Sequence, residues 1–254
     1  MNTARTIPTA EPFFIPGGNI GCLLVHGFTG TPKEMRMLAD SLAQEDYTIL
    51  APRLAGHATR VEDITRSHWE DWLSSVEDAI NLLKGCTQTQ VIMGLSMGGI
   101  LALIAAARYD LAGVISFSTP CSLPGDPRAK YLPVLKYFIR KVPKGKPDWR
   151  NLEAAKDHAH YPYYPTTAIL QLKELIDVMQ TELVNVKIPA LFVQSRADQG
   201  IPAESLDTLF AKVSSTDKHK LWVENSGHVI IREPERELIF AAVKTFVKRI
   251  TAAT

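Results

Sequence analysis

The sequence predicts an α/β protein with one mostly parallel central sheet flanked by helices. Short apolar runs alternate with longer amphipathic stretches along most of the chain. Buried parallel strands read as near-continuous apolar runs of this kind. Strands that alternate with helices are typical of a parallel sheet covered on both faces. The 254 residues suffice for one large domain with a modest insertion.

Six apolar runs are predicted strands, and they cover 21–28, 47–52, 90–94, 112–118, 189–195 and 220–225. Thr31-Pro32-Lys33-Glu34 reads as an N-cap, a first-turn proline and a capping-box glutamate, and it predicts a helix start. Ser67-His68-Trp69-Glu70 predicts a second one in the same way. Further predicted helices cover 98–108, 166–186, 202–213 and 234–250.

Residues 120–186 interrupt this alternation. The stretch is rich in proline and contains the aromatic group Tyr161-Pro162-Tyr163-Tyr164. A connection this long inside a compact domain is usually functional. We therefore expect an α/β core formed by 1–119 and 187–254, and a small helical cap or lid with a return helix in 120–186.

Composition and charge exclude several classes of protein. The net charge is +1, which gives no general attraction to nucleic acid or to an anionic membrane. No apolar stretch is long enough for a membrane span, and the N-terminal residues do not resemble a secretory signal. The three cysteines lack metal-type spacing, and Cys22 reads as a buried core thiol. We expect a cytoplasmic chain with reduced thiols, no metal, no nucleic-acid partner and no stable membrane insertion, as a monomer or weak homodimer.

Residues 91–103, VIMGLSMGGILAL, place Ser96 between a predicted strand and a glycine-rich helix. A serine at such a turn projects its hydroxyl above the sheet, and the helix N-terminus favours negative charge beside it. Serine needs a base and an orienting acid to become a nucleophile. Asp198 and His228 each follow a later predicted strand. Catalytic groups of parallel sheets lie beyond the carboxyl ends of strands, so we expect all three to meet.

A tetrahedral oxyanion also needs donors. We expect them to be the backbone N–H groups of Met97, after the serine, and of Phe28, in the loop His26-Gly27-Phe28-Thr29-Gly30. Gly27 and Gly30 would let that loop turn its amides inward.

Other residues compete for these roles. Asp126 is the substitute acid, and Asp177 is disfavoured because it lies inside a predicted helix. His26 is expected to brace the oxyanion loop, and His57 to be structural. His158 and His160 are two positions apart, which is poor spacing for a shared helical face and does not indicate a metal site.

These motifs resemble the α/β-hydrolase superfamily over nearly the whole chain. Within it, LLVHGFTGTPKEMRMLADSL, YTILAPRLAGHAT, VIMGLSMGG, QLKELI, PALFVQSRAD and SGHVI are similar to small bacterial carboxylesterases and monoacylglycerol lipases. The resemblance implies the α/β-hydrolase fold, a compact helical cap, no cofactor and a triad of Ser96, Asp198 and His228, with Phe28 and Met97 at the oxyanion. One departure is Gly56-His57-Ala58, where relatives often have GHG; it affects no triad member.

The resulting hypothesis is a serine carboxylesterase for short- to medium-chain acyl esters, with monoacylglycerols as a specific case and a small-molecule ester as its partner. Ser96 would attack the ester, His228 would move the proton and Asp198 would orient the imidazole. The alternatives are a thioesterase, lactonase or aryl-esterase on the same site, or a non-catalytic ligand-binding protein of this fold. Relatives that cleave epoxides or haloalkanes carry an aspartate where this chain has Ser96.

Overall fold

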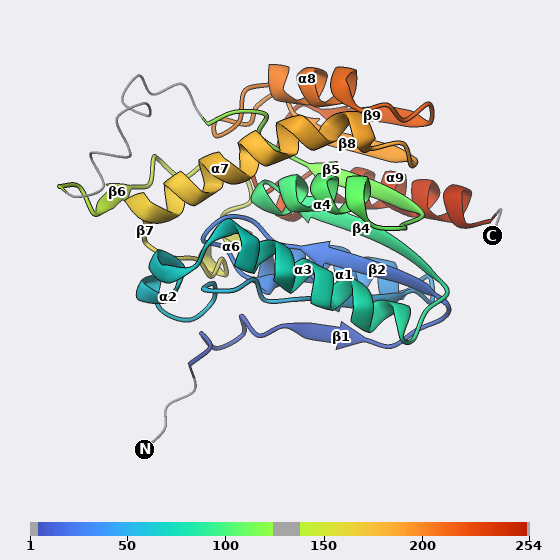
Figure 1. Cartoon of the computed structure of the whole chain (residues 1–254), viewed down its shortest axis with the longest axis horizontal. Helices are drawn as coiled ribbons and strands as arrows, with labels where there is room; N and C mark the ends of the chain where they lie inside the picture. Colours follow the sequence, from blue (N-terminus) through green and yellow to red (C-terminus); the bar gives the residue numbers. More distant parts are fainter. Residues whose placement is uncertain (1–4, 124–137, 253–254) are drawn as a thin grey trace.

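The computed structural model describes residues 5–123 and 138–252. Across these ranges a seven-stranded sheet has the order β1-β3-β2-β4-β5-β8-β9 (Figure 1). Its strands are β1 Phe13–Ile15, β2 Ile20–Val25, β3 Thr48–Ala51, β4 Thr89–Leu95, β5 Gly113–Phe117, β8 Ala190–Ser195 and β9 Lys218–Val223. All neighbours pair in parallel except β1, which runs antiparallel to β3. The six predicted strands are therefore present, and β1 is an edge strand that the sequence pattern did not reveal.

Helices cover both faces of this sheet (Figure 1). The helices of the described residues are α1 Arg36–Ala43, α2 Val61–Arg66, α3 Trp69–Lys84, α4 Met97–Arg108, α6 Leu152–Lys156, α7 Thr166–Glu182, α8 Glu204–Lys212 and α9 Arg236–Thr251, and of these α2 and α6 lie away from the sheet. Short 3-10 helices are η1 Pro32–Met35, η3 Leu183–Asn185 and η4 Ile230–Arg232. In the described residues no helix is both long and apolar enough to cross a membrane.

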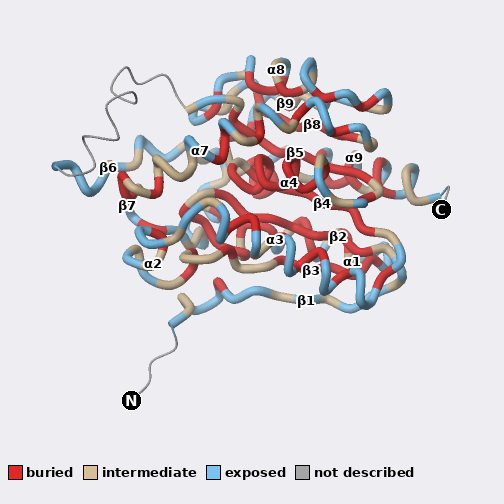
Figure 2. Tube along the Cα trace, in the orientation of Figure 1, coloured by how far each residue is buried: buried red, intermediate tan, exposed pale blue. Residues whose placement is uncertain are grey.

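The alternation of side chains along each strand divides the core into two layers. On β2, Leu23 and Val25 face the layer built with α3, α4, α7 and α8. Cys22 and Leu24 face the opposite layer, built with α1 and α9. Cys22 is fully buried, as expected for a core thiol. Figure 2 shows that burial is concentrated in the central strands and in α4, which has apolar or small residues on all sides.

Both predicted capping boxes were wrong in detail. At the first, the chain forms the 3-10 helix η1, and Thr31 makes no side-chain capping bond. The Glu34 carboxylate instead accepts a hydrogen bond from the Gly27 N–H at 2.8 Å. At the second, α3 begins one residue later than expected, with His68 as N-cap and Asp71 accepting the His68 N–H.

The insertion, where it is described, contains more than helices. Strands β6 (Lys141–Pro143) and β7 (Tyr163–Pro165) form a separate antiparallel pair. The predicted helix in 166–186 is present as α7 and η3, and α7 packs against α4 on one face of the sheet. Asp126, the substitute acid, lies outside the described residues. The division into core and cap stays a prediction.

The turn between β4 and α4 is packed so tightly that glycine is required. A Cβ at Gly94 would lie 2.0 Å from the Gly98 carbonyl oxygen. A Cβ at Gly98 would lie 2.1 Å from the Val25 carbonyl oxygen of the neighbouring strand β2. Real Cβ atoms do not approach backbone this closely, so any side chain at either position forces strand and helix apart.

We therefore expect Gly98→Ala to lower the free energy of unfolding by about 3 kcal/mol, the upper end of the cost of overpacking. The measurement is chemical denaturation followed by circular dichroism. Gly145→Ala is the matched control, because a Cβ at Gly145 meets nothing within 4 Å. The control should stay within about 0.5 kcal/mol of the unchanged protein. Equal stability of the two variants would contradict the packing argument.

Candidate active site

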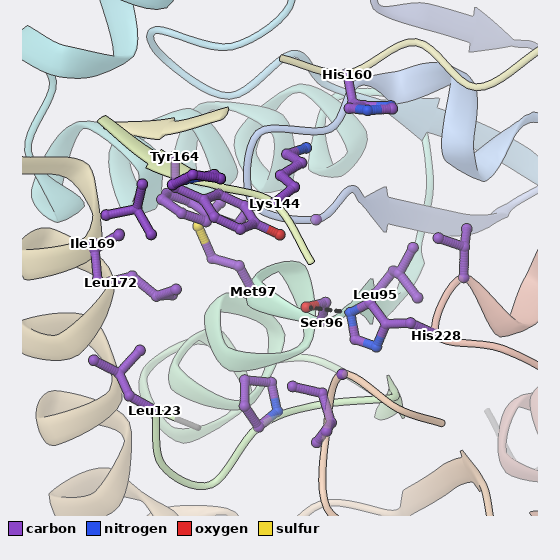
Figure 3. A pocket seen from close by; sticks show the side chains of 18 of the residues that line it. Leu95, Ser96, Met97, Leu123, Lys144, His160, Tyr164, Ile169, Leu172 and His228 are labelled. Atoms are coloured by element: carbon purple, nitrogen blue, oxygen red, sulfur yellow. Dashed lines mark hydrogen bonds between the residues drawn. The ribbon is translucent and has the colours of Figure 1, made fainter. Parts of the chain in front are cut away.

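Ser96 occupies a strained turn at the carboxyl end of β4. Its backbone has φ 56° and ψ −117°, in the left-handed half of conformational space that non-glycine residues rarely adopt. The Ser96 N–H donates to the Phe117 carbonyl oxygen at 2.8 Å, which ties the turn to β5. The side chain is lifted out of the sheet and lines a cavity (Figure 3).

His228 and Asp198 reach Ser96 from the ends of two other strands. The Nε2 atom of His228 lies 3.0 Å from the Ser96 Oγ atom (Figure 3). Its Nδ1 atom lies 2.9 Å from the Asp198 Oδ2 atom. The other carboxylate oxygen of Asp198 accepts the N–H groups of Gly200 and Ile201 at 2.8 and 3.0 Å. These bonds fix the carboxylate so that His228 can donate from Nδ1 and accept from Ser96 at Nε2.

The surroundings set the charge of His228. Burial lowers the pKa of this imidazole, but the nearby carboxylates, above all the charge and hydrogen bond of Asp198, together outweigh burial and raise the pKa above its ordinary value of 6.5. Glu34 and Asp148 add to the same effect. The site is therefore arranged to stabilise a protonated His228, the form that an imidazole takes after it accepts a serine proton.

The two predicted oxyanion donors lie beside Ser96. Met97 is the first residue of α4, where a backbone N–H has no carbonyl in its own helix to bond. Phe28 follows β2, and both residues line the cavity. As expected, His26 braces the Phe28 loop: its Nε2 atom accepts the Leu54 N–H at 3.2 Å, and its Nδ1 atom lies 3.0 Å from the Gly27 carbonyl oxygen.

Sequence reasoning missed two carboxylates near this site. Glu34 is only 4% exposed and lines the cavity. Burial raises its pKa to about 7. Asp148 accepts the Gln199 N–H, next to Asp198, at 2.8 Å. Glu34 stands four positions before Leu38, on the apolar face that Leu38 and Leu42 give to this segment. A carboxylate on an apolar helix face was the sequence signal that could have revealed its role.

The cavity has a volume of about 630 Å³, and its two sides differ in chemistry. Ile169, Leu172 and Leu123 lie on one side of Ser96 (Figure 3). Lys144 and His160 lie on the other, beyond the ring of Tyr164 (Figure 3). We call the first group the apolar arm. The polar arm consists of Lys144 and His160 with two further lining residues, Glu34 and His158.

Three further histidines, His57, His158 and His160, have a pKa below the ordinary value of 6.5, mainly because they are buried. His57 is buried against Trp72 and His26, and burial lowers its pKa to about 4. Burial lowers the pKa of His158 to about 3 and also lowers that of His160. Within 5–123 and 138–252, no group of three or more His, Cys, Asp or Glu side chains has the arrangement of a metal site.

A family model described as serine aminopeptidase, S33, matches residues 20–235. The chain is 35% identical over 239 residues to a thermostable monoacylglycerol lipase from Bacillus sp. (strain H-257), covering 91% of each chain. It is 30% identical over 246 residues to a carboxylesterase from Bacillus subtilis (strain 168), covering 96% of this chain and 98% of the relative.

Solved structures agree with these relatives. The structure of a metagenome-derived lipolytic enzyme superimposes with a TM-score of 0.88 at 31% identity, covering 96% of this chain and 99% of that one. A monoacylglycerol lipase of Paleococcus ferrophilus gives a TM-score of 0.83 at 18% identity, covering 95% and 99%. The chain therefore belongs to the S33 family of α/β-hydrolases and is a serine hydrolase.

Proposed function

We propose that the protein hydrolyses carboxylic esters of short to medium acyl chain length, with monoacylglycerols as the natural class. The observation that carries this proposal is the hydrogen-bonded series Ser96–His228–Asp198, which opens into a cavity with one apolar and one polar arm. The names of the two Bacillus relatives support it.

The proposed reaction begins when the Ser96 hydroxyl attacks the ester carbonyl and His228 takes its proton. Asp198 keeps the imidazole in the required tautomer and stabilises its charged form. The N–H groups of Phe28 and Met97 bind the oxyanion of the tetrahedral intermediate. His228 then protonates the leaving alcohol, and a water activated by His228 releases the acid from the acyl-enzyme.

The two arms suggest how a monoacylglycerol would bind. The apolar arm would bury the acyl chain, and each buried methylene contributes about 0.8 kcal/mol. The polar arm would receive the glycerol, whose hydroxyl groups need hydrogen-bond partners once they leave water. We also propose that residues 120–186 act as the cap, because Ile139, Lys144 and Tyr164 close one side of the cavity. Thioester, lactone or aryl-ester hydrolysis would use the same catalytic groups and remains the alternative.

Ser96→Ala should abolish turnover of p-nitrophenyl butyrate, with a fall in kcat of at least about 10⁴-fold, because the covalent intermediate can no longer form. The measurement is release of p-nitrophenol by wild type and variant at equal concentration. Equal activity, or inertness of both proteins, would contradict the assignment of Ser96.

Leu172→Phe should shorten the apolar arm. We expect kcat/KM for p-nitrophenyl octanoate to fall about 10-fold or more and that for the acetate to change less than about 2-fold, since loss of acyl contact costs 1–3 kcal/mol per methylene in a hydrophobic pocket. Leu152→Phe is the matched control, because Leu152 is exposed on α6 and lies outside the cavity. A uniform effect on all chain lengths would place the acyl chain elsewhere.

Asp198→Asn should lower both kcat and the pKa of His228. Without the carboxylate, burial is opposed only by the smaller effects of Glu34 and Asp148, so the pKa of the imidazole should fall below its value in the unchanged protein. We expect kcat to fall about 10⁴-fold, as for the equivalent change in other triads. NMR titration of the imidazole resonances gives the pKa, and Asp207→Asn, an exposed carboxylate paired with Lys220, is the control. An unchanged His228 titration would rule out the proposed role of Asp198.

A further inference from the structure

Gly27, the residue before Phe28, is held by hydrogen bonds from both sides of its backbone. The Gly27 N–H donates to the Glu34 Oε2 atom at 2.8 Å. The Gly27 carbonyl oxygen lies 3.0 Å from the Nδ1 atom of His26 and accepts the Gly30 N–H at 3.1 Å. The Gly27 carbonyl and the Phe28 N–H belong to one planar trans peptide, in which these two groups point in opposite directions. Fixing Gly27 therefore fixes the direction of the Phe28 N–H.

The Glu34 carboxyl group packs directly against the backbone of the Phe28 loop at Gly27 and Gly30. A Cβ at Gly30 would come 2.2 Å from the Glu34 Oε1 atom, so the carboxyl group fills the space that a side chain at Gly30 would take. A Cβ at Gly27 would lie 3.3 Å from Glu34 Oε2 and 3.5 Å from the Ser96 Cβ atom. Glu34 thus lies close behind the nucleophile and the oxyanion loop, with 4% of its surface exposed.

We propose that Glu34 is a positioning residue of the ester-hydrolysing site, one that holds Gly27 so that the Phe28 N–H is aimed at the oxyanion and that places a second carboxylate near His228. The inference rests on the proposed function, because it concerns the same oxyanion and the same base. Glu34 acts through Gly27 and through its charge.

The charge of Glu34 depends on groups from several elements. His158, after α6, has its Nε2 atom 3.5 Å from Glu34 Oε1, and its low pKa of about 3 keeps it neutral near pH 7. Lys144, His228 and Arg232 favour the ionised carboxylate, whereas burial opposes it, so the pKa of Glu34 is raised to about 7. The ionised carboxylate in turn raises the pKa of His228. The charge of Glu34 therefore changes around pH 7, and with it the effect that Glu34 has on His228.

Two substitutions separate the two effects. Glu34→Gln keeps an oxygen that accepts the Gly27 N–H but removes the charge, whereas Glu34→Ala removes both. For p-nitrophenyl butyrate, Glu34→Ala should lower kcat about 10²-fold with KM within about 2-fold, the scale of losing or misplacing one oxyanion donor. Glu34→Gln should recover most of kcat.

A boronic acid that forms a tetrahedral adduct with Ser96 tests the positioning role directly. Its inhibition constant would not change if Glu34 served only the stability of the fold. Its inhibition constant should rise in Glu34→Ala by the same factor by which kcat/KM falls, because both report oxyanion binding. In Glu34→Gln the acid limb of the kcat/KM profile should move to lower pH by about 0.5 unit, since a negative charge near His228 is gone. An unchanged boronic acid constant in Glu34→Ala would overturn the positioning role, and an unmoved acid limb in Glu34→Gln would overturn the electrostatic one.

A comparison of two substrates tests whether Glu34 instead binds the alcohol part of the ester. A positioning residue lowers kcat by the same factor for p-nitrophenyl butyrate and for 1-monobutyrylglycerol. A loss confined to the glycerol ester would mean that Glu34 binds glycerol hydroxyl groups, and would overturn the proposal. Wild-type hydrolysis that disappears in Ser96→Ala, together with full activity of Glu34→Ala, would refute this inference and leave the proposed function intact.

Matched controls keep the test independent of folding. Glu182→Gln alters another partly buried carboxylate, which accepts hydrogen bonds from the Arg108 guanidinium and lies outside the cavity. It should leave the pH profile and boronic acid affinity unchanged even if it lowers stability. If Glu34→Ala does not fold, Gly30→Ala displaces the carboxyl without removing it and should reproduce the fall in kcat; normal kcat in that variant would count against the proposal.

Discussion

The close contact between the start of α4 and strand β2 is the constraint on which the site depends. Gly98 lies against the Val25 carbonyl oxygen, and Gly94 lies against the backbone of Gly98 across the turn. This contact forces Ser96 into its left-handed conformation and lifts its hydroxyl off the sheet. It also brings the first turn of α4 next to the loop after Val25. The same packing contact therefore positions the proposed nucleophile and both predicted oxyanion donors.

His228 and Asp198, the proposed base and its orienting acid, are held by other parts of the chain. Their loops come after β8 and β9, and the insertion contacts both of them. The Asp148 side chain accepts the Gln199 N–H, and a Cβ at Gly227, next to His228, would lie 1.6 Å from the Asp148 carbonyl oxygen. Gly227 is thus the residue that lets the insertion approach the catalytic loop. The part of the chain that shapes the cavity also supports the geometry of the triad.

Hydrophobic pattern and chain order were enough to predict the main strands and the meeting of the triad. Apolar runs indicated six strands, and a polar residue after each of three strands brought Ser96, Asp198 and His228 together at one sheet edge. The role of Glu34 was missed because it depends on which of two hydrogen-bond partners the side chain selects. Glu34 had a local capping role available, but the buried Gly27 N–H needed an acceptor, and this tertiary bond prevailed. The edge strand β1 is short and only partly buried, so it leaves little periodicity to detect.

Asp198 and Glu34 both raise the pKa of His228, and their surroundings differ in a way that suggests different tasks. Asp198 is surrounded by three donors, namely the Gly200 and Ile201 N–H groups and the His228 ring, so hydrogen bonds fix its position. Glu34 accepts one backbone N–H, and burial keeps its pKa near 7. A small change in pH therefore alters the charge of Glu34 while the Gly27 bond persists, because a protonated carboxyl group still has an acceptor oxygen. The oxyanion loop can stay in place while the basicity of His228 is adjusted, which separates geometry from electrostatics within a single side chain.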